Sequence, residues 1–270
     1  TFMNGEQKLA LSGGFGEVAF GAINNTALGA HVYSQPFGTA IGSGFRATSG
    51  SAVSSEVRSD NSFQYTSPSL VGGLKLNWIN RKAQSATATN ANYNASLGAQ
   101  QQASVNSFAA MYNAGPLNAI ITRDVQDATG VNTATAGTGA LTAGTRGTFT
   151  ALAGNYNLGA TTIYAGYQGN KAVDSANAVK TDRSALTLAA SYVMGVNTFM
   201  GSYQRASNSL TSTSSNLLGL GYEYALSKTA AVVARYERIA DGANFALTTG
   251  YTAGTTTDRT RMGVGLRVGF

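Results

Sequence analysis

Charged side chains recur at alternate positions near the end of the chain, where they could act on ions through charge rather than through covalent chemistry. In the last ten residues, RMGVGLRVGF, an extended strand would place Arg261 and Arg267 on one face with three glycines. The bulky apolar residues from Met262 to Phe270 would fall on the other face. Because unpaired arginines are costly to bury, the arginine face must meet water. The apolar face could pack in a protein core or contact membrane lipid.

Other segments place charges in the same alternating way. In NLLGLGYEYAL, Glu223 shares a face with two glycines, and in TAAVVARYERI the side chains of Arg235 and Glu237 share a face. Lys75 opposes leucines and a tryptophan in GLKLNWINRK, and Arg183 begins the alternating run RSALTLAASYVM. Charges on a water-filled face bias which ions approach it. These residues therefore predict electrostatic control of passing solutes.

The residue types needed for catalysis or metal binding are scarce. The single histidine, His31, has no cysteine, carboxylate pair or nucleophile elbow near it in the sequence. The spacing of carboxylates matches no metal site, and the glycine-rich stretches lack the following helix of a phosphate loop. Basic residues are scattered rather than clustered as a nucleic-acid interface requires. The sequence predicts no enzyme, no cofactor, no metal and no nucleic-acid partner.

The composition is unusual for a water-soluble domain. Only 11% of the 270 residues are charged and 43% are hydrophobic, with 33 glycines and no cysteine. Soluble domains carry about 25% charged residues. No run of 18 apolar residues, which a membrane-spanning helix would need, is present. The formal net charge of +6 favours anions to an extent that depends on where the charges lie.

The alternating segments are about ten residues long, which is the length of a transmembrane strand, and we count about thirteen of them. Short turns such as Gly195-Val196 alternate with long polar loops such as 83–104 and 125–146. This asymmetry is typical of an all-β, antiparallel, up-and-down transmembrane barrel with a periplasmic and an extracellular rim. A soluble β-sandwich or β-propeller, whose apolar faces pack together, is the alternative.

Three stretches carry a resemblance to a known family: LSGGFGEVAFG (11–21), RSDNSFQYTSPSLVGGLKL (58–76) and the terminal GVGLRVGF. In this order they resemble the general porins of Gram-negative outer membranes, particularly the trimeric, anion-preferring type of β-proteobacteria. The resemblance covers most of the chain. It implies an outer-membrane channel for passive diffusion of small hydrophilic solutes and ions, a homotrimer in a lipid bilayer, and a single barrel domain over residues 1–270.

The resemblance also implies a sixteen-stranded barrel with one long loop, here residues 23–60, folded inward to narrow the pore. It further implies that Phe270 is part of the signal read by the barrel-assembly machinery. Relatives have three strands before the segment resembling LSGGFGEVAFG, so we expect N-terminal strands outside this sequence. Ala19 and Ala22 stand where anion-preferring relatives commonly carry arginines, so the expected anion preference is weak to moderate.

The expected pore-lining residues combine the alternation with the resemblance. Arg58 stands where the inward loop rejoins the wall, and Arg46 and His31 lie within that loop, which has no carboxylate from Ile23 to Val53. The remaining members face the lumen by alternation: Lys75, Arg183, Arg235, Glu223, Glu237, Arg261 and Arg267. Pairing of Arg235 with Glu237, or of Glu223 with a neighbour, across strands is the structural alternative. A substrate-specific channel and a scaffold barrel around a partner protein are the alternative functions.

Overall fold

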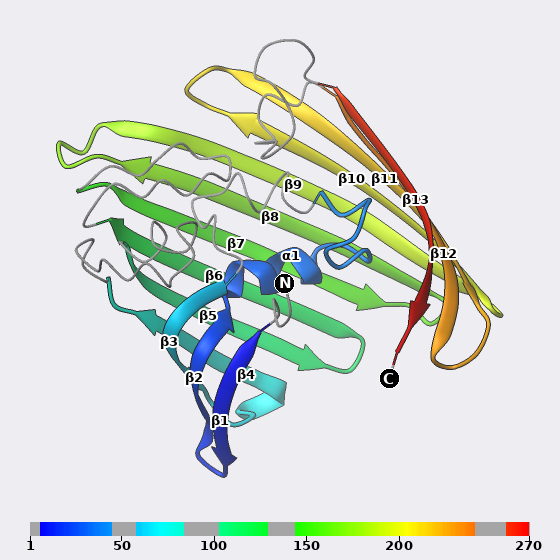
Figure 1. Ribbon diagram of the computed structural model, residues 1–270, viewed down its shortest axis with the longest axis horizontal. Helices are drawn as coiled ribbons and strands as arrows, with labels where there is room; N and C mark the ends of the chain where they lie inside the picture. Colours follow the sequence, from blue (N-terminus) through cyan, green and yellow to red (C-terminus); the bar gives the residue numbers. More distant parts are fainter. Residues whose placement is uncertain (1–5, 45–57, 84–102, 129–143, 241–257, 270) are drawn as a thin grey trace, which may run out of the picture.

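The computed structural model describes residues 6–44, 58–83, 103–128, 144–240 and 258–269, and their strands form one curved sheet (Figure 1). Thirteen strands lie side by side in chain order, each antiparallel to the next. The strands are β1 (Gln7–Gly13), β2 (Gly16–Asn24), β3 (Arg58–Thr66), β4 (Leu74–Arg81), β5 (Ala103–Ala114), β6 (Leu117–Ala128), β7 (Arg146–Asn157), β8 (Thr161–Val173), β9 (Val179–Met194), β10 (Asn197–Asn208), β11 (Thr213–Ala225), β12 (Ala230–Ala240) and β13 (Arg259–Val268). The helices are α1 (Thr26–Tyr33) and the 3-10 turn η1 (Val71–Gly73).

The turns at one end of the strands are short because glycine permits the tight reversals there. Gly115 between β5 and β6 and Gly195 between β9 and β10 have φ values of 55° and 59°, in the left-handed region that other residues rarely adopt. At the opposite end most connections are longer, as expected, whereas those from β8 to β9 and from β10 to β11 span only residues 174–178 and 209–212. About thirteen strands were expected, and the described parts of the chain contain thirteen.

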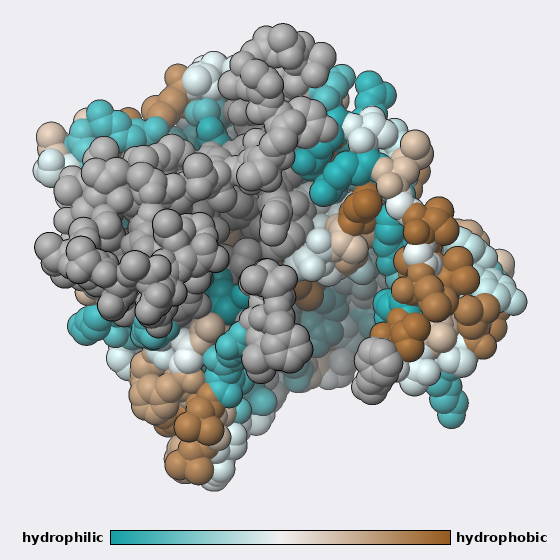
Figure 2. Space-filling model, viewed as in Figure 1, coloured by the Kyte–Doolittle hydropathy of each residue, from teal (hydrophilic) through white to brown (hydrophobic). Residues whose placement is uncertain are grey.

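The two faces of the sheet differ in polarity as the alternation predicts. On β13 the outward side chains of Met262, Val264 and Leu266 are 75%, 82% and 63% exposed. Hydrophobic side chains gather over β12 and β13 at the right of Figure 2, while hydrophilic ones line the hollow side of the sheet. An apolar outer surface of this kind is suited to hydrocarbon.

The hollow side of the sheet holds α1, which lies across the inner faces of β5 to β8 (Figure 1). Its small residues Ala27 and Ala30 are buried against Ile120, Phe149 and Ala151 of the strands. A second inward apolar cluster, Ala185, Ala206, Leu217 and Ile239, lies on β9 to β12. Among the described residues, no helix has the length and apolar character needed to span a membrane.

The two edge strands of the sheet do not pair with each other. β1 and β13 stand at opposite ends of the strand order, and in an up-and-down series an odd number of strands leaves the first and last running in the same direction. Direct antiparallel closure of these thirteen strands is thus impossible. The expected sixteen-stranded closure and the single domain over residues 1–270 stay predictions.

The assignment of faces on β13 can be tested with one substitution on each face. Leu266→Arg places a charge on the outward face and is expected to lower the free energy of unfolding in lipid vesicles by about 2–4 kcal/mol near the bilayer midplane. Arg267→Ser removes an exposed ion pair with Glu223 and should cost less than about 1 kcal/mol. Equal losses in the two variants would show that the faces are misassigned.

Candidate functional site

The chain between β2 and β3 enters the hollow side of the sheet, and its described part, residues 25–44, is here called the inward segment. It begins with α1 on β5 to β8 and continues through residues 35–44 to the inner faces of β10 to β12. The segment therefore crosses the hollow side from one part of the wall to another. Each end of the inward segment forms hydrogen bonds with a buried carboxylate of the sheet.

The first carboxylate, Asp124 on β6, holds the start of α1. Its Oδ1 accepts hydrogen bonds from Thr26 Oγ1 at 2.7 Å and from Ser107 Oγ at 2.6 Å, and a third from Thr122 Oγ1 at 3.2 Å. The backbone N–H of Ala27 donates to the same side chain. Asp124 is 1% exposed, so its carboxylate links hydroxyls of β5 and β6 to the helix start, where backbone N–H groups favour an anion.

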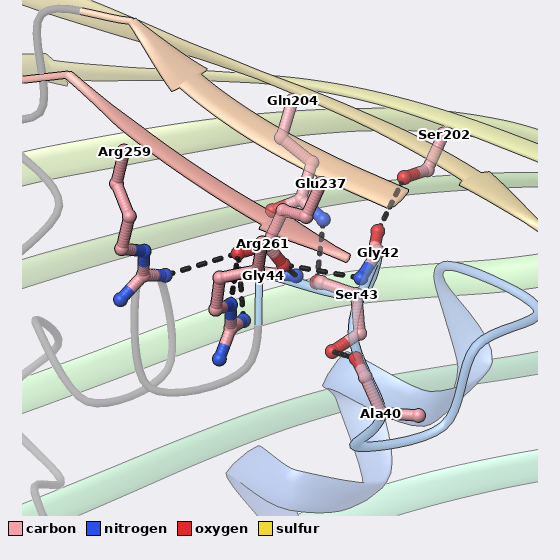
Figure 3. A network of polar contacts seen from close by, with 9 residues as sticks. All are labelled: Ala40, Gly42, Ser43, Gly44, Ser202, Gln204, Glu237, Arg259 and Arg261. Carbon is pink, nitrogen blue, oxygen red and sulfur yellow. Dashed lines mark hydrogen bonds and ion pairs between the residues drawn. The ribbon is translucent and has the colours of Figure 1, made fainter. Parts of the chain in front are cut away.

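The second carboxylate, Glu237 on β12, holds the end of the inward segment (Figure 3). Its Oε2 accepts hydrogen bonds from the backbone N–H groups of Gly42 and Gly44, both at 3.2 Å. Its Oε1 accepts from Arg259 Nη2 at 3.0 Å and from Arg261 Nε at 2.8 Å. Glu237 is 1% exposed. Both oxygens are thus occupied, one by the segment and one by the arginines of β13.

Two further side chains of β10 bind the carbonyl groups of the same turn. Ser202 Oγ donates to the carbonyl oxygen of Gly42 at 2.7 Å, and Gln204 Nε2 donates to that of Ser43 at 2.6 Å. Beside them, a Cβ at Gly219 would overlap the carbonyl of Gly42. Glycine is required at this point of β11 because the backbone of the inward segment lies directly against the strand.

A second group of charged side chains lies on the inner face of β11 to β13, which together with β10 form the wall around Glu237. Glu223 on β11 forms ion pairs with Arg235 of β12 and with Arg267 of β13, the latter at 2.8 Å. The Arg235 guanidinium also lies over the ring of Phe37, 5.5 Å from its centroid, which is a cation–π distance. Of the two pairings considered from the sequence, Glu223 with a neighbour is therefore confirmed, whereas Glu237 bonds to Arg259 and Arg261.

Two of the expected pore-lining residues lie elsewhere. His31 is in α1 and is 4% exposed, so it does not line a pore; burial lowers the pKa of its imidazole to about 4, which keeps it neutral at neutral pH. Arg58 pairs in register with Asn24, next to the inward, fully buried pair of Ile23 and Ser59. Successive side chains on a strand point to opposite faces, so Arg58 points away from the hollow side and donates to Asn24 Oδ1 at 3.2 Å.

A β-bulge between β2 and β3 sets the direction of Arg58. The register between β2 and β3 shifts between Gly21 and Ile23, and Asn61 has a φ of 51°. A bulge of this kind reverses the phase of the alternation beyond it. Arg46 and Phe270 lie outside the described residues.

The remaining expected residues face the hollow side. Lys75 pairs with Met111, which packs against the core under α1, and Arg183 pairs with the inward Asn170. Near Lys75, Lys8 Nζ lies 2.9 Å from Glu17 Oε1.

Expectations from the sequence did not include Asp124, Gln204 or Glu17. Alternation alone could have placed each of them inward, but it could not show what they bind.

Two arginines of β13 are more exposed than the carboxylates they pair with, whereas Arg235 and Arg259 are only 11% and 10% exposed. The side chains of Arg261 and Arg267 are 34% and 67% exposed, whereas those of Glu237 and Glu223 are 1% and 16% exposed. Glu237 and Glu223 are covered by the inward segment and by arginines, so on β11 to β13 water on the hollow side meets Arg261 and Arg267 rather than these carboxylates. No group of side chains that could hold a metal ion is found among the described residues.

The fold and this wall define a class of protein: an antiparallel transmembrane barrel narrowed by a segment folded to its inside. A family model described as Gram-negative porin matches residues 1–244. The chain belongs to the Gram-negative porin family, so it forms a channel in the bacterial outer membrane, as expected from the resemblance.

Solved structures share this fold at low sequence identity. An anion-selective porin from Comamonas acidovorans has 21% identity and a TM-score of 0.72, with 97% of this chain and 77% of that chain covered. OmpT of Vibrio cholerae has 17% identity and a TM-score of 0.68, covering 97% and 79%. OmpF of Salmonella typhi, in complex with daunomycin, has 14% identity and a TM-score of 0.63, covering 93% and 74%. A search among curated proteins found no match.

Proposed function

We propose that this chain forms a water-filled, non-catalytic channel with a preference for small anions, working as a homotrimer. The observation that carries the proposal is the difference in exposure on the inner wall, where Arg261 and Arg267 reach the hollow side while Glu237 and Asp124 are buried beneath the inward segment. The name of the Comamonas neighbour, an anion-selective porin, and the trimer form of Vibrio OmpT support the preference and the assembly.

The segment itself adds to this preference. Its described residues include no Asp or Glu, and it binds the wall carboxylates through backbone N–H groups and hydroxyls. The inward segment, Lys75 and Arg267 are thus proposed to be the parts of the channel that a passing ion meets. We propose the barrel-assembly machinery as the partner that reads Phe270.

The selectivity proposal is tested by reversal potentials in planar bilayers under a KCl gradient. A unit charge a few ångströms from an ion acts on it by about 1 kcal/mol in bulk water and more where water is sparse. Chloride is therefore expected to be preferred at low salt, and the preference should shrink as the Debye length falls from about 10 Å at 0.1 M to about 3 Å at 1 M.

Neutralising the exposed inner cations should reduce the preference. The double variant Lys75→Gln, Arg267→Gln is expected to shift the reversal potential toward zero, while leaving Arg235 to pair with Glu223. Arg238→Gln is the matched control, because Arg238 is a half-exposed arginine at an outward position of β12. Potassium preference in the native channel, or a double variant that behaves like the control, would refute the proposal.

A further inference from the structure

The outward face of β6 to β9 contains a hollow of about 650 Å³ whose lining is almost entirely apolar. Its floor is formed by three small residues that stand beside one another at the same register. Ala119 pairs with Gly154, and Gly154 pairs with Ala165. We name this hollow the outer trough.

Bulky side chains border the outer trough above and below. On one side Leu152 pairs with Tyr167 and Tyr167 with Leu186; these side chains are 59%, 55% and 47% exposed. On the other side Leu117 pairs with Tyr156 and Tyr156 with Ile163. The two rows are four residues apart along a strand, about 13 Å at 3.3 Å per residue, so the space between their side chains is narrow.

The outer trough lies in the half of the wall nearest the short turns. Ala119 is the third residue of β6, and Gly154 lies three residues before the end of β7. Short turns mark the periplasmic rim of outer-membrane barrels. Tyr156, close to the rim, is 41% exposed, as is typical of the aromatic residues that lie at the membrane interface.

We propose that the outer trough is a binding site for an acyl chain of a phospholipid from the periplasmic leaflet. A groove in the hydrocarbon region must be filled, and no Lys, Arg, Asp or Glu is among its lining residues to pair with a charged group of a partner polypeptide. The narrow width between the two bulky rows suits one hydrocarbon chain. The position near the short turns places the site in the periplasmic leaflet.

Elsewhere on the described outer surface, Ala190 and Gly201 form a shorter floor of two small residues between β9 and β10, and the arrangement on β11 to β13 differs further. On β11 to β13 the small residue Ala234 stands between Tyr222 and Val264 in the register, so its neighbours fill the space beside it. An acyl chain there would lie on protruding side chains, whereas the outer trough offers contacts from its floor and from both rows of bulky side chains. Dispersion contacts grow with the number of neighbouring atoms, and a lipid in the trough should exchange more slowly.

The test is native mass spectrometry of the full chain, extracted in mild detergent from vesicles that contain both phospholipid and lipid A. The native protein is expected to retain phospholipid. Ala165→Leu fills the floor of the outer trough and should weaken retention by about tenfold, the change expected from losing contact with about two methylene groups. Ala234→Leu is the matched control and should retain phospholipid as the native protein does.

Folding is checked independently by single-channel conductance, which should be the same in Ala165→Leu, Ala234→Leu and the native protein because both positions face away from the hollow side. Three results would overturn the proposal: a native protein that retains no lipid, equal retention by Ala165→Leu, or retention of lipid A in place of phospholipid. A second copy of the chain seated in the trough would instead appear as loss of the trimer in Ala165→Leu with unchanged lipid retention.

Discussion

Replacing Glu237 by alanine is expected to lower the free energy of unfolding by about 3–5 kcal/mol, because removing one partner of a buried ion pair leaves the others uncompensated. Arg259 and Arg261 would lose the oxygen they share, and the N–H groups of Gly42 and Gly44 would lose the other. The end of the inward segment would then be released from β12. The measurement is denaturant unfolding in lipid vesicles.

The same variant should also change conduction. A released segment no longer occupies a fixed place on the hollow side, so single-channel currents are expected to become larger and noisier than those of the native protein. Gly219→Leu should give the same change in current without removing a charge, because its side chain would occupy the position of the Gly42 carbonyl. Glu223→Gln is the control, since Glu223 makes no contact with residues 42–44 in the hydrogen bonds and ion pairs described.

If Glu237→Ala unfolds as the native protein does, the two arginines must find other partners and Glu237 is not the anchor of the segment. If Glu237→Ala is destabilised while its current matches that of the native channel, the carboxylate stabilises the wall but does not position the segment.

Replacing Asp124 by alanine is expected to cost about 3 kcal/mol, because hydrogen bonds to a charged group each contribute about 1.5–3 kcal/mol and buried donors would be left unpaired. The hydroxyls of Thr26, Ser107 and Thr122 all donate to one oxygen of this carboxylate. The start of α1 would lose its contact with β6. Unfolding in vesicles and protease sensitivity within residues 25–44 measure the effect.

Two variants show whether the charge or the packing matters at Asp124. Asp124→Asn keeps the shape and one acceptor oxygen, and should lose less than Asp124→Ala. Ser107→Ala removes one donor while Thr26 and Thr122 remain, and should cost about 1 kcal/mol. A loss in Asp124→Asn as large as that in Asp124→Ala would mean that the negative charge is essential to the anchor. Native-like stability of Asp124→Ala would mean that α1 is held by its apolar contacts alone.

The amino-acid sequence by itself determined the strands and their two faces. Alternation is a local property of two adjacent residues on a strand, so Leu266 and Arg267 could be placed on opposite faces without knowing their neighbours. The same reasoning gave the number of strands, the short turns with glycine, and the inward position of Lys75, Arg235 and Glu223. These inferences need no contact between distant parts of the chain.

Only the tertiary structure decided what the inward charges bind. Glu237 accepts hydrogen bonds from Gly42, 195 residues earlier in the chain, and alternation carries no information about such pairs. His31 is buried because α1 lies against the wall, and Arg58 points outward because a bulge between β2 and β3 reverses the phase of the strand. The exposure of the wall cations likewise depends on which carboxylates the inward segment covers, and that is fixed only when the chain folds back across the sheet.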